Sequence, residues 1–142
     1  MFRTLTETIF VAPQINAEAV AAAKAVGVTL IINNRPEDES LDQTPGAEIE
    51  AAARAADIDY VAIPVTHSGF SQPQVEAMAQ ALEGAKGKVL AYCRSGTRST
   101  LLWALAQARG GKDPDTLGSI AANAGYDLGP IRPLLDMLKG QA

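Results

Sequence analysis

Residues 93–99, Cys-Arg-Ser-Gly-Thr-Arg-Ser, bring together the side-chain types that nucleophilic chemistry on an anion requires. Cys93 is the only cysteine of the chain, and the thiolate is the nucleophilic form of cysteine. The guanidinium groups of Arg94 and Arg98 add positive potential around the sulfur, and Gly96 can take a positive φ in a tight turn. These features favour a reactive thiolate. The alternative for Cys93 is a small buried side chain that only packs. We predict as catalytic residues Cys93, Arg98 and Ser99, and as anion-binding residues of the same loop Arg94, Ser95, Gly96 and Thr97.

The elements on either side of this loop explain how it would bind an anion. Val89–Tyr92 is an apolar run typical of a short buried strand, and from Thr97 onward the apolar residues recur with helical spacing. A chain that turns from strand to helix this tightly points successive peptide N–H groups at one spot, next to the positive end of the helix. The hydroxyls of Thr97 and Ser99 are additional donors. The spacing therefore predicts an anion-binding loop around the sulfur of Cys93.

Two further polar clusters, Asn33–Glu39 and Thr66–Phe70, each follow a predicted strand. In the first, Arg35 is predicted to bind an anion or to orient a loop, with one of the neighbouring acids as its partner or as a proton donor. The alternative, which we favour for the acids, is a solvated acidic turn. In the second, His67 is the only histidine of the chain and is predicted to bind the substrate anion. A lone histidine in a loop is more often a surface residue, so both interpretations stay open.

Strands and helices alternate along the whole chain. The predicted strands are Thr8–Val11, Val28–Asn33, Tyr60–Val65 and Val89–Tyr92, and the predicted helices begin at Ala17, Pro45, Gln72, Thr97, Pro114 and Pro130. This order predicts an α/β fold with a mostly parallel central sheet and helices on both faces. Ligands of such sheets bind outside the carboxyl ends of the strands. We therefore expect the clusters that contain Arg35, His67 and Cys93 to converge at one edge of the sheet.

Composition narrows the class of protein. A length of 142 residues predicts one domain, 1–142, and an apolar content of 47% with 20% charged residues is typical of a soluble globular protein. A net charge of −4 disfavours a nucleic-acid surface, and no apolar run or leader pattern indicates a membrane or secretory segment, so the expected location is the cytoplasm. One cysteine excludes an internal disulfide and suits a reducing compartment. The chain has no recognisable metal-ligand set and no nucleotide fingerprint, so no cofactor is expected.

The motifs resemble those of known families. The strand, the Cys-x4-Arg-Ser loop and the helix are similar to the phosphate-binding loop of cysteine-dependent phosphatases and to the active-site loop of rhodanese sulfurtransferases. More closely, segments 31–39 and 91–99 resemble the bacterial beta-lactamase-hydrolase-like, phosphatase-like domains, and the resemblance extends to Ala-Gly-Tyr-Asp-Leu at 124–128. It implies a tyrosine-phosphatase-like or dual-specificity-phosphatase-like fold, in a family whose members carry both phosphatase and sulfurtransferase labels.

Two departures from the phosphatase pattern favour sulfur transfer. Phosphatases of this type have Cys-x5-Arg, whereas Arg98 is five positions after Cys93, as in the shorter rhodanese loop. Those phosphatases also take a leaving-group proton from an aspartate beside the nucleophile, and residues 64–71 contain no carboxylate, which leaves His67 or an acid of 37–39 as substitutes. The main prediction is a sulfurtransferase that carries a persulfide on Cys93. The alternatives are a phosphatase with a phosphocysteine intermediate and a non-catalytic anion-binding or redox-sensing module. The expected partner is a small anion: thiosulfate, a persulfide or a phosphate ester.

Overall fold

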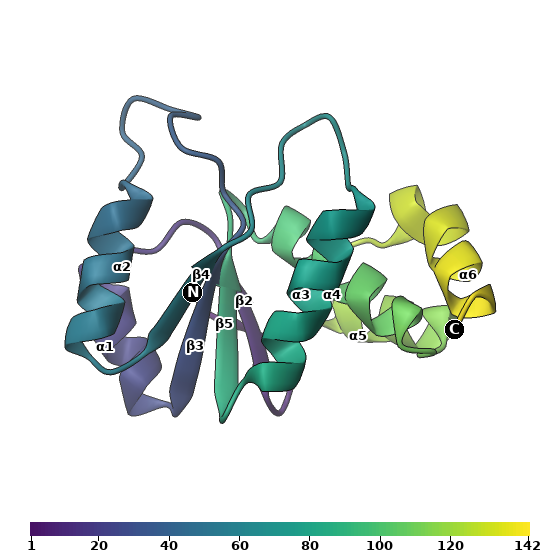
Figure 1. Ribbon diagram of the computed structural model, residues 1–142, viewed down its shortest axis with the longest axis horizontal. Coiled ribbons are helices and arrows are strands. Elements are labelled where there is room, and N and C mark those ends of the chain that lie inside the picture. The colour runs from purple at the N-terminus through teal and green to yellow at the C-terminus, as the bar shows by residue number, and fades with distance from the viewer.

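The computed structural model describes residues 1–142 and contains a five-stranded sheet of order β1-β2-β5-β3-β4. The strands are β1 (Arg3–Thr6), β2 (Ile9–Ala12), β3 (Val28–Asn33), β4 (Asp59–Ala62) and β5 (Lys88–Tyr92). β1 pairs with β2 in antiparallel fashion, and every other pair of neighbours is parallel (Figure 1). The predicted α/β fold is therefore confirmed.

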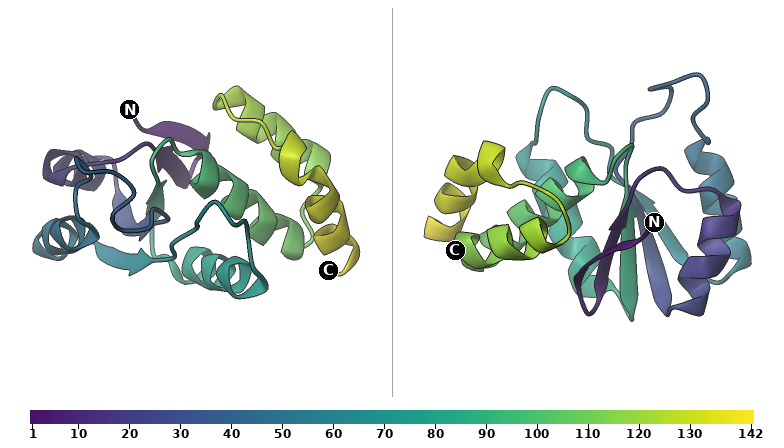
Figure 2. Two further views of the ribbon diagram at one scale, coloured as in Figure 1. Left: turned by 90° about the horizontal axis from the view of Figure 1, so that it is seen from above. Right: turned by 180° about the vertical axis from the view of Figure 1, so that it is seen from behind.

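Helices cover both faces of this sheet. They are α1 (Ala17–Ala25), α2 (Gly46–Ala55), α3 (Gln72–Gly84), α4 (Thr97–Arg109), α5 (Pro114–Asn123), the 3-10 turn η1 (Gly129–Ile131) and α6 (Arg132–Gly140). α1 and α2 lie on one face and α3 and α4 on the other, while α5 and α6 form an outer layer that packs on α4 (Figures 1 and 2). Each face of the sheet has its own cluster of buried apolar side chains. None of the helices is long and apolar enough to cross a bilayer.

The strand and helix that carry the Cys93 loop are mostly buried. In β5, Val89 and Ala91 pack toward α3 and α4, while Leu90 and Tyr92 pack toward α1 and α2. α4 lies between the sheet and the outer helices, so nine of its 13 residues are buried. Burial of one large apolar side chain is worth about 1.5–3 kcal/mol, so this junction is well anchored. The loop therefore sits on a rigid base.

Two elements differ from the prediction. The sequence predicted no strand before Thr8, but β1 precedes β2 as its partner in a hairpin. Only Leu5 of its four residues is buried, so no alternation of apolar and polar residues marks this strand in the sequence. The strand predicted as Tyr60–Val65 ends as β4 at Ala62. Its backbone continues nearly extended, and the N–H groups of Ile63 and Val65 donate to the carbonyls of Asn33 and Asn34 (both 2.9 Å). β4 is an edge strand, so Pro64 between them faces away from β3, where no N–H is needed. The regular ladder ends because the acceptors advance by one residue, from Asn33 to Asn34, while the donors advance by two.

The carboxyl ends of β3, β4 and β5 lie at one edge of the sheet, as their parallel pairing requires. Above this edge stand two long loops, one after β3 and one after β4, and the Cys93 loop turns into α4 beside them (Figure 1). We call residues 34–45 the acidic loop and residues 63–71 the histidine loop. The candidate site is the space that these loops and the Cys93 loop surround.

Candidate active site

The sulfur of Cys93 is held by the backbone of its own loop. The N–H of Gly96 donates to Sγ at 3.1 Å, and Cys93 is fully buried. Gly96 has φ of +91°, a conformation that favours glycine, and a Cβ at this position would collide with the hydroxyl of Tyr126. Two independent constraints therefore require glycine here.

Four peptide N–H groups of this loop and the first turn of α4 have no acceptor in the protein: those of Arg94, Ser95, Arg98 and Ser99. Unpaired N–H groups at the start of a helix carry partial positive charge and suit an anion. The predicted cluster of backbone donors beside Cys93 is thus present and unsatisfied within the chain.

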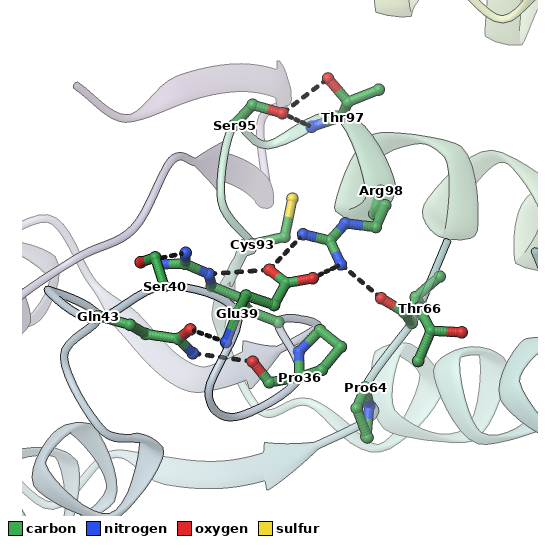
Figure 3. A network of polar contacts seen from close by, with 12 residues as sticks. Pro36, Glu39, Ser40, Gln43, Pro64, Thr66, Cys93, Ser95, Thr97 and Arg98 are labelled. Atoms are coloured by element: carbon green, nitrogen blue, oxygen red, sulfur yellow. Dashed lines mark hydrogen bonds and ion pairs between the residues drawn. The ribbon is translucent and has the colours of Figure 1, made fainter. Parts of the chain in front are cut away.

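Side chains brace the outer rim of the loop. The hydroxyl of Ser95 donates to Thr97 Oγ1 at 3.0 Å and accepts from the N–H of Thr97 at 3.3 Å (Figure 3). From the far side, the hydroxyl of buried Tyr126 donates to the carbonyl of Ser95 at 3.1 Å. The sequence predicted Tyr126 to be a packing residue. It packs, and it also fixes the carbonyl of the loop, a role that only the docking of the outer helices reveals.

Arg98 and Glu39 form the central ion pair of the site. Arg98 Nη1 donates to Glu39 Oε2 at 2.7 Å and Arg98 Nη2 donates to Glu39 Oε1 at 2.8 Å, a fork of two parallel bonds (Figure 3). Nη1 also donates to the carbonyl of Val65 at 2.6 Å, so the histidine loop contacts the pair through its backbone. Both charged side chains are only 13% exposed. The geometry fixes the plane of the guanidinium.

This ion pair leaves one edge of Arg98 free. A guanidinium has five N–H donors, and here three are used, two on Nη1 and one on Nη2. The two that remain, on Nε and Nη2, lie along the same edge and form a second fork. In Figure 3 the carboxylate of Glu39 and the sulfur of Cys93 lie on opposite sides of the guanidinium. The unoccupied fork therefore faces the side on which Cys93 lies.

Arg35 does not have the anion-binding position that the sequence predicted. Its side chain is 4% exposed, and its donors go to Glu39 Oε1 (2.9 Å), Gln14 Oε1 (2.9 Å) and Ser40 Oγ (3.2 Å). With its nitrogens bonded to protein groups, Arg35 instead holds the carboxylate that holds Arg98. The alternative interpretation, a loop-orienting residue with an acidic partner, matches these contacts. Nothing in the sequence singled out Gln14, because only the fold brings it to this edge.

The interpretation of the acids as a solvated turn is wrong for Glu39. Hydrogen bonds from Arg98, with the further help of Arg35, lower the pKa of Glu39 from its ordinary value of 4.5 to about 2, against the opposing effect of burial. Glu39 is thus ionised at neutral pH and cannot donate a proton there. Its neighbour Asp38 is exposed, which agrees with the solvated-turn interpretation, and Glu37 accepts the N–H of Gly46 at the start of α2 (3.0 Å).

Ser99 was predicted to be catalytic, but its hydroxyl faces away from the sulfur. It is fully buried and donates to Oδ1 of Asn34 at 2.8 Å, and Nδ2 of Asn34 donates to the carbonyl of Ile63 at 2.9 Å. These bonds tie the start of α4 to the ends of β3 and β4. The hydroxyl of Ser99 is therefore a structural link, and only its peptide N–H remains available to an anion.

His67 and Arg94 are brought to the mouth of the site without being fixed in it. Both side chains are exposed, and neither has a hydrogen bond or an ion pair. His67 lies in the histidine loop, where the only contact with Arg98 is through Val65. The three clusters thus converge as expected, but in different ways. The Cys93 loop and the acidic loop meet through the side chains of Arg98 and Glu39, whereas the histidine loop contacts Arg98 only through its backbone. No group of three or more metal-ligating side chains occurs in the chain.

The class of protein is indicated by a mostly parallel sheet with a buried cysteine at the carboxyl end of β5, in a loop with unpaired backbone N–H groups. A family model described as "Beta-lactamase hydrolase-like protein, phosphatase-like domain" matches residues 1–110. The chain belongs to this family.

Individual relatives agree with this assignment. The Beta-lactamase hydrolase-like protein of Xylella fastidiosa is 32% identical over 88% of this chain, but the match spans only 29% of that longer protein. The crystal structure of a candidate phosphatase of Neisseria meningitidis is 32% identical, covers 96% of each chain and has a TM-score of 0.84. TpbA of Pseudomonas aeruginosa, solved with phosphotyrosine, is 18% identical with a TM-score of 0.69, covers 99% of this chain and 88% of its own, and shows the shared fold.

These comparisons favour the phosphatase alternative over our main prediction. The family and the solved relatives are described as phosphatase-like, and none of them indicates a sulfurtransferase. The loop spacing that favoured sulfur transfer is unchanged, but it carries less weight than a match over most of the chain. The predicted family resemblance is confirmed.

Proposed function

We propose that this chain is a cysteine-dependent phosphatase that hydrolyses phosphate monoesters through a phosphocysteine. The observation that carries the proposal is the free fork of Arg98, held in place from behind by Glu39 on the side away from Cys93. A planar fork of two donors matches two oxygens of a phosphoryl group. The four unpaired peptide N–H groups of the loop supply further donors for its charge.

The reaction has two steps. In the first, the thiolate of Cys93 attacks phosphorus, an S–P bond forms, and the P–O bond to the leaving group breaks with its electron pair on oxygen. Arg98 and the loop N–H groups stabilise the charge on the equatorial oxygens. In the second, water attacks phosphorus, the S–P bond breaks, and inorganic phosphate and the thiolate are released.

The shorter loop does not remove the donors that this chemistry needs. Compared with Cys-x5-Arg, the Cys-x4-Arg loop lacks one residue, yet four N–H groups and two guanidinium donors remain unpaired. In the transition state, the transferred phosphoryl group has three equatorial oxygens that need hydrogen-bond donors. The count of available donors is therefore sufficient.

Release of inorganic phosphate from p-nitrophenyl phosphate tests the proposal. We expect turnover by the wild type, none by Cys93→Ser, and a mass gain of one phosphoryl group on the wild type alone after an acid quench. Cys93→Ser is a close match in size at a fully buried position, so a folded but inactive variant assigns the loss to the thiolate.

A parallel incubation with thiosulfate separates the two chemistries. A mass gain of one sulfur atom on Cys93, removed by dithiothreitol, with no phosphate released from the aryl ester, would replace this proposal with sulfur transfer. Binding of phosphate without either reaction would indicate the non-catalytic module instead.

A further inference from the structure

Breaking a phosphate ester creates a negative charge on the leaving oxygen. That oxygen either takes a proton from an acid of the enzyme as the bond breaks, or it departs as an anion. Which of these happens decides the esters that an enzyme can cleave. Given the proposed function, the side chains around this site indicate which of the two routes applies.

The acidic loop has four carboxylates, and three of them have fixed partners. Glu39 is ionised and binds Arg98 and Arg35. Glu37 accepts the N–H that begins α2, and Asp42 accepts the hydroxyl of Ser40 at 2.7 Å, a bond that lowers its pKa. In Glu39 and Asp42 these bonds stabilise the carboxylate form, which cannot donate a proton, and in Glu37 the bond ties the carboxylate to the start of α2.

The fourth carboxylate, that of Asp38, has no contact with the site. It is exposed in a residue with φ of +62° and makes no hydrogen bond or ion pair. The acidic loop therefore presents no proton donor to the leaving oxygen.

The histidine loop offers no better donor. It contains no carboxylate. Of its three hydroxyls, those of Thr66 and Ser68 are hydrogen-bonded to each other, and that of Ser71 caps α3 by accepting the N–H of Gln74. His67 is exposed and makes no hydrogen bond that would aim its imidazole toward Cys93. The group of this loop that contacts Arg98 is the carbonyl of Val65, and a carbonyl cannot donate a proton.

We infer that this enzyme acts on phosphate esters with weakly basic leaving groups, which are aryl phosphates such as tyrosine phosphate and acyl phosphates, rather than alkyl phosphates such as those of serine and threonine. The P–O bond breaks with its electron pair on the leaving oxygen, which departs as an aryloxide or a carboxylate and is protonated afterwards by water. Because a positioned acid contributes about 10²–10⁴-fold, its absence penalises alkyl esters by the same order.

The test is the dependence of kcat/KM on the basicity of the leaving group. The wild type is assayed with a series of substituted phenyl phosphates and with O-phosphoserine. kcat/KM reports the first step, transfer to Cys93, and so is not hidden by slow hydrolysis of the phosphocysteine. We expect a steep fall as the leaving group becomes more basic, and at least about 10²-fold slower reaction of phosphoserine than of p-nitrophenyl phosphate.

Two variants make the test specific. Asp38→Asn and His67→Ala remove the two exposed groups that could act as the acid only if their loops moved toward Cys93. We expect both variants to keep the wild-type dependence of kcat/KM on leaving-group basicity. A nearly flat slope in the wild type would overturn the inference and leave the phosphatase proposal intact, as would a slope that steepens in either variant. No turnover of any ester would instead refute the phosphatase proposal itself, and the inference with it.

Discussion

The two long loops above the sheet edge differ in how they meet the active site. The acidic loop reaches it with a buried side chain, Glu39, which binds Arg98 and Arg35. The histidine loop reaches it with one backbone carbonyl, that of Val65, and leaves His67 in solvent. One loop therefore positions Arg98 with a charged side chain, while the other contacts it only through its backbone. Loops that look equally polar in the sequence have different roles, and buried ion pairs distinguish them.

Among substitutions in these two loops, the largest effect that we expect is from Glu39→Gln. Glutamine keeps the shape of the side chain but removes its charge, which leaves buried Arg35 unpaired and Arg98 free to turn. Misplacement of a catalytic group by about 1 Å costs about 10²-fold, and loss of one partner of a buried ion pair costs about 3 kcal/mol. The measurements are kcat/KM with p-nitrophenyl phosphate and the free energy of unfolding in urea.

The matched control is Asp38→Asn in the same loop. Asp38 is exposed and has a positive φ that asparagine also tolerates, so both quantities are expected to stay at their wild-type values. Equal effects of the two substitutions would show that loop charge in general matters, and that the ion pair of Glu39 has no special role.

Acid pH should weaken the fold through the same pair. The folded-state pKa of Glu39 is about 2, below its ordinary value of 4.5, so its stabilising effect is complete above pH 4.5 and is lost as the pH falls toward 2. The difference in unfolding free energy between wild type and Glu39→Gln is therefore expected to be constant from pH 5 to 7 and to shrink below about pH 4.5. A difference that stays constant down to pH 2.5 contradicts this account.

Gln43→Ala tests whether the acidic loop must be pinned for Glu39 to act. Gln43 donates to the carbonyl of Pro36 at 2.8 Å and accepts from the N–H of Glu39 at 2.9 Å. Losing both bonds should lower the unfolding free energy by about 1–2 kcal/mol and reduce kcat/KM by less than about tenfold. The control is Gln72→Ala, an exposed residue at the start of α3 beside the histidine loop, for which neither change is expected.

The smallest effect is expected from His67→Ala. The side chain is exposed and without polar partners, and surface substitutions of this kind stay within about 0.5 kcal/mol, or about twofold in kcat/KM. Steady-state kinetics between pH 5 and 8 measures it. A loss of tenfold or more, or a change in the shape of the pH profile, would place the histidine loop in the chemistry after all.

The sequence was sufficient to predict what depends on local order. The strand, the tight loop around Cys93 and the helix that follows are contiguous, so their geometry is encoded within a few residues. Glu39 was underestimated because the identity of an acid's partner depends on which strand ends meet, and Arg98 is 59 positions away from it in the chain. Ser99 was overestimated for the converse reason: closeness to Cys93 in sequence does not fix the direction of a hydroxyl, which here points to Asn34.

The burial of α4 has a consequence for local opening of the molecule. Most residues of α4 and β5 are buried, so we expect hydrogen exchange of their amides to require global unfolding, whereas amides of the acidic loop should exchange through local opening. We therefore expect Cys93 to belong to the last cooperative unit to open, and Glu39, which aligns Arg98, to belong to an earlier one. On heating, we expect Arg98 to lose its alignment while the side chain of Cys93 is still held in place.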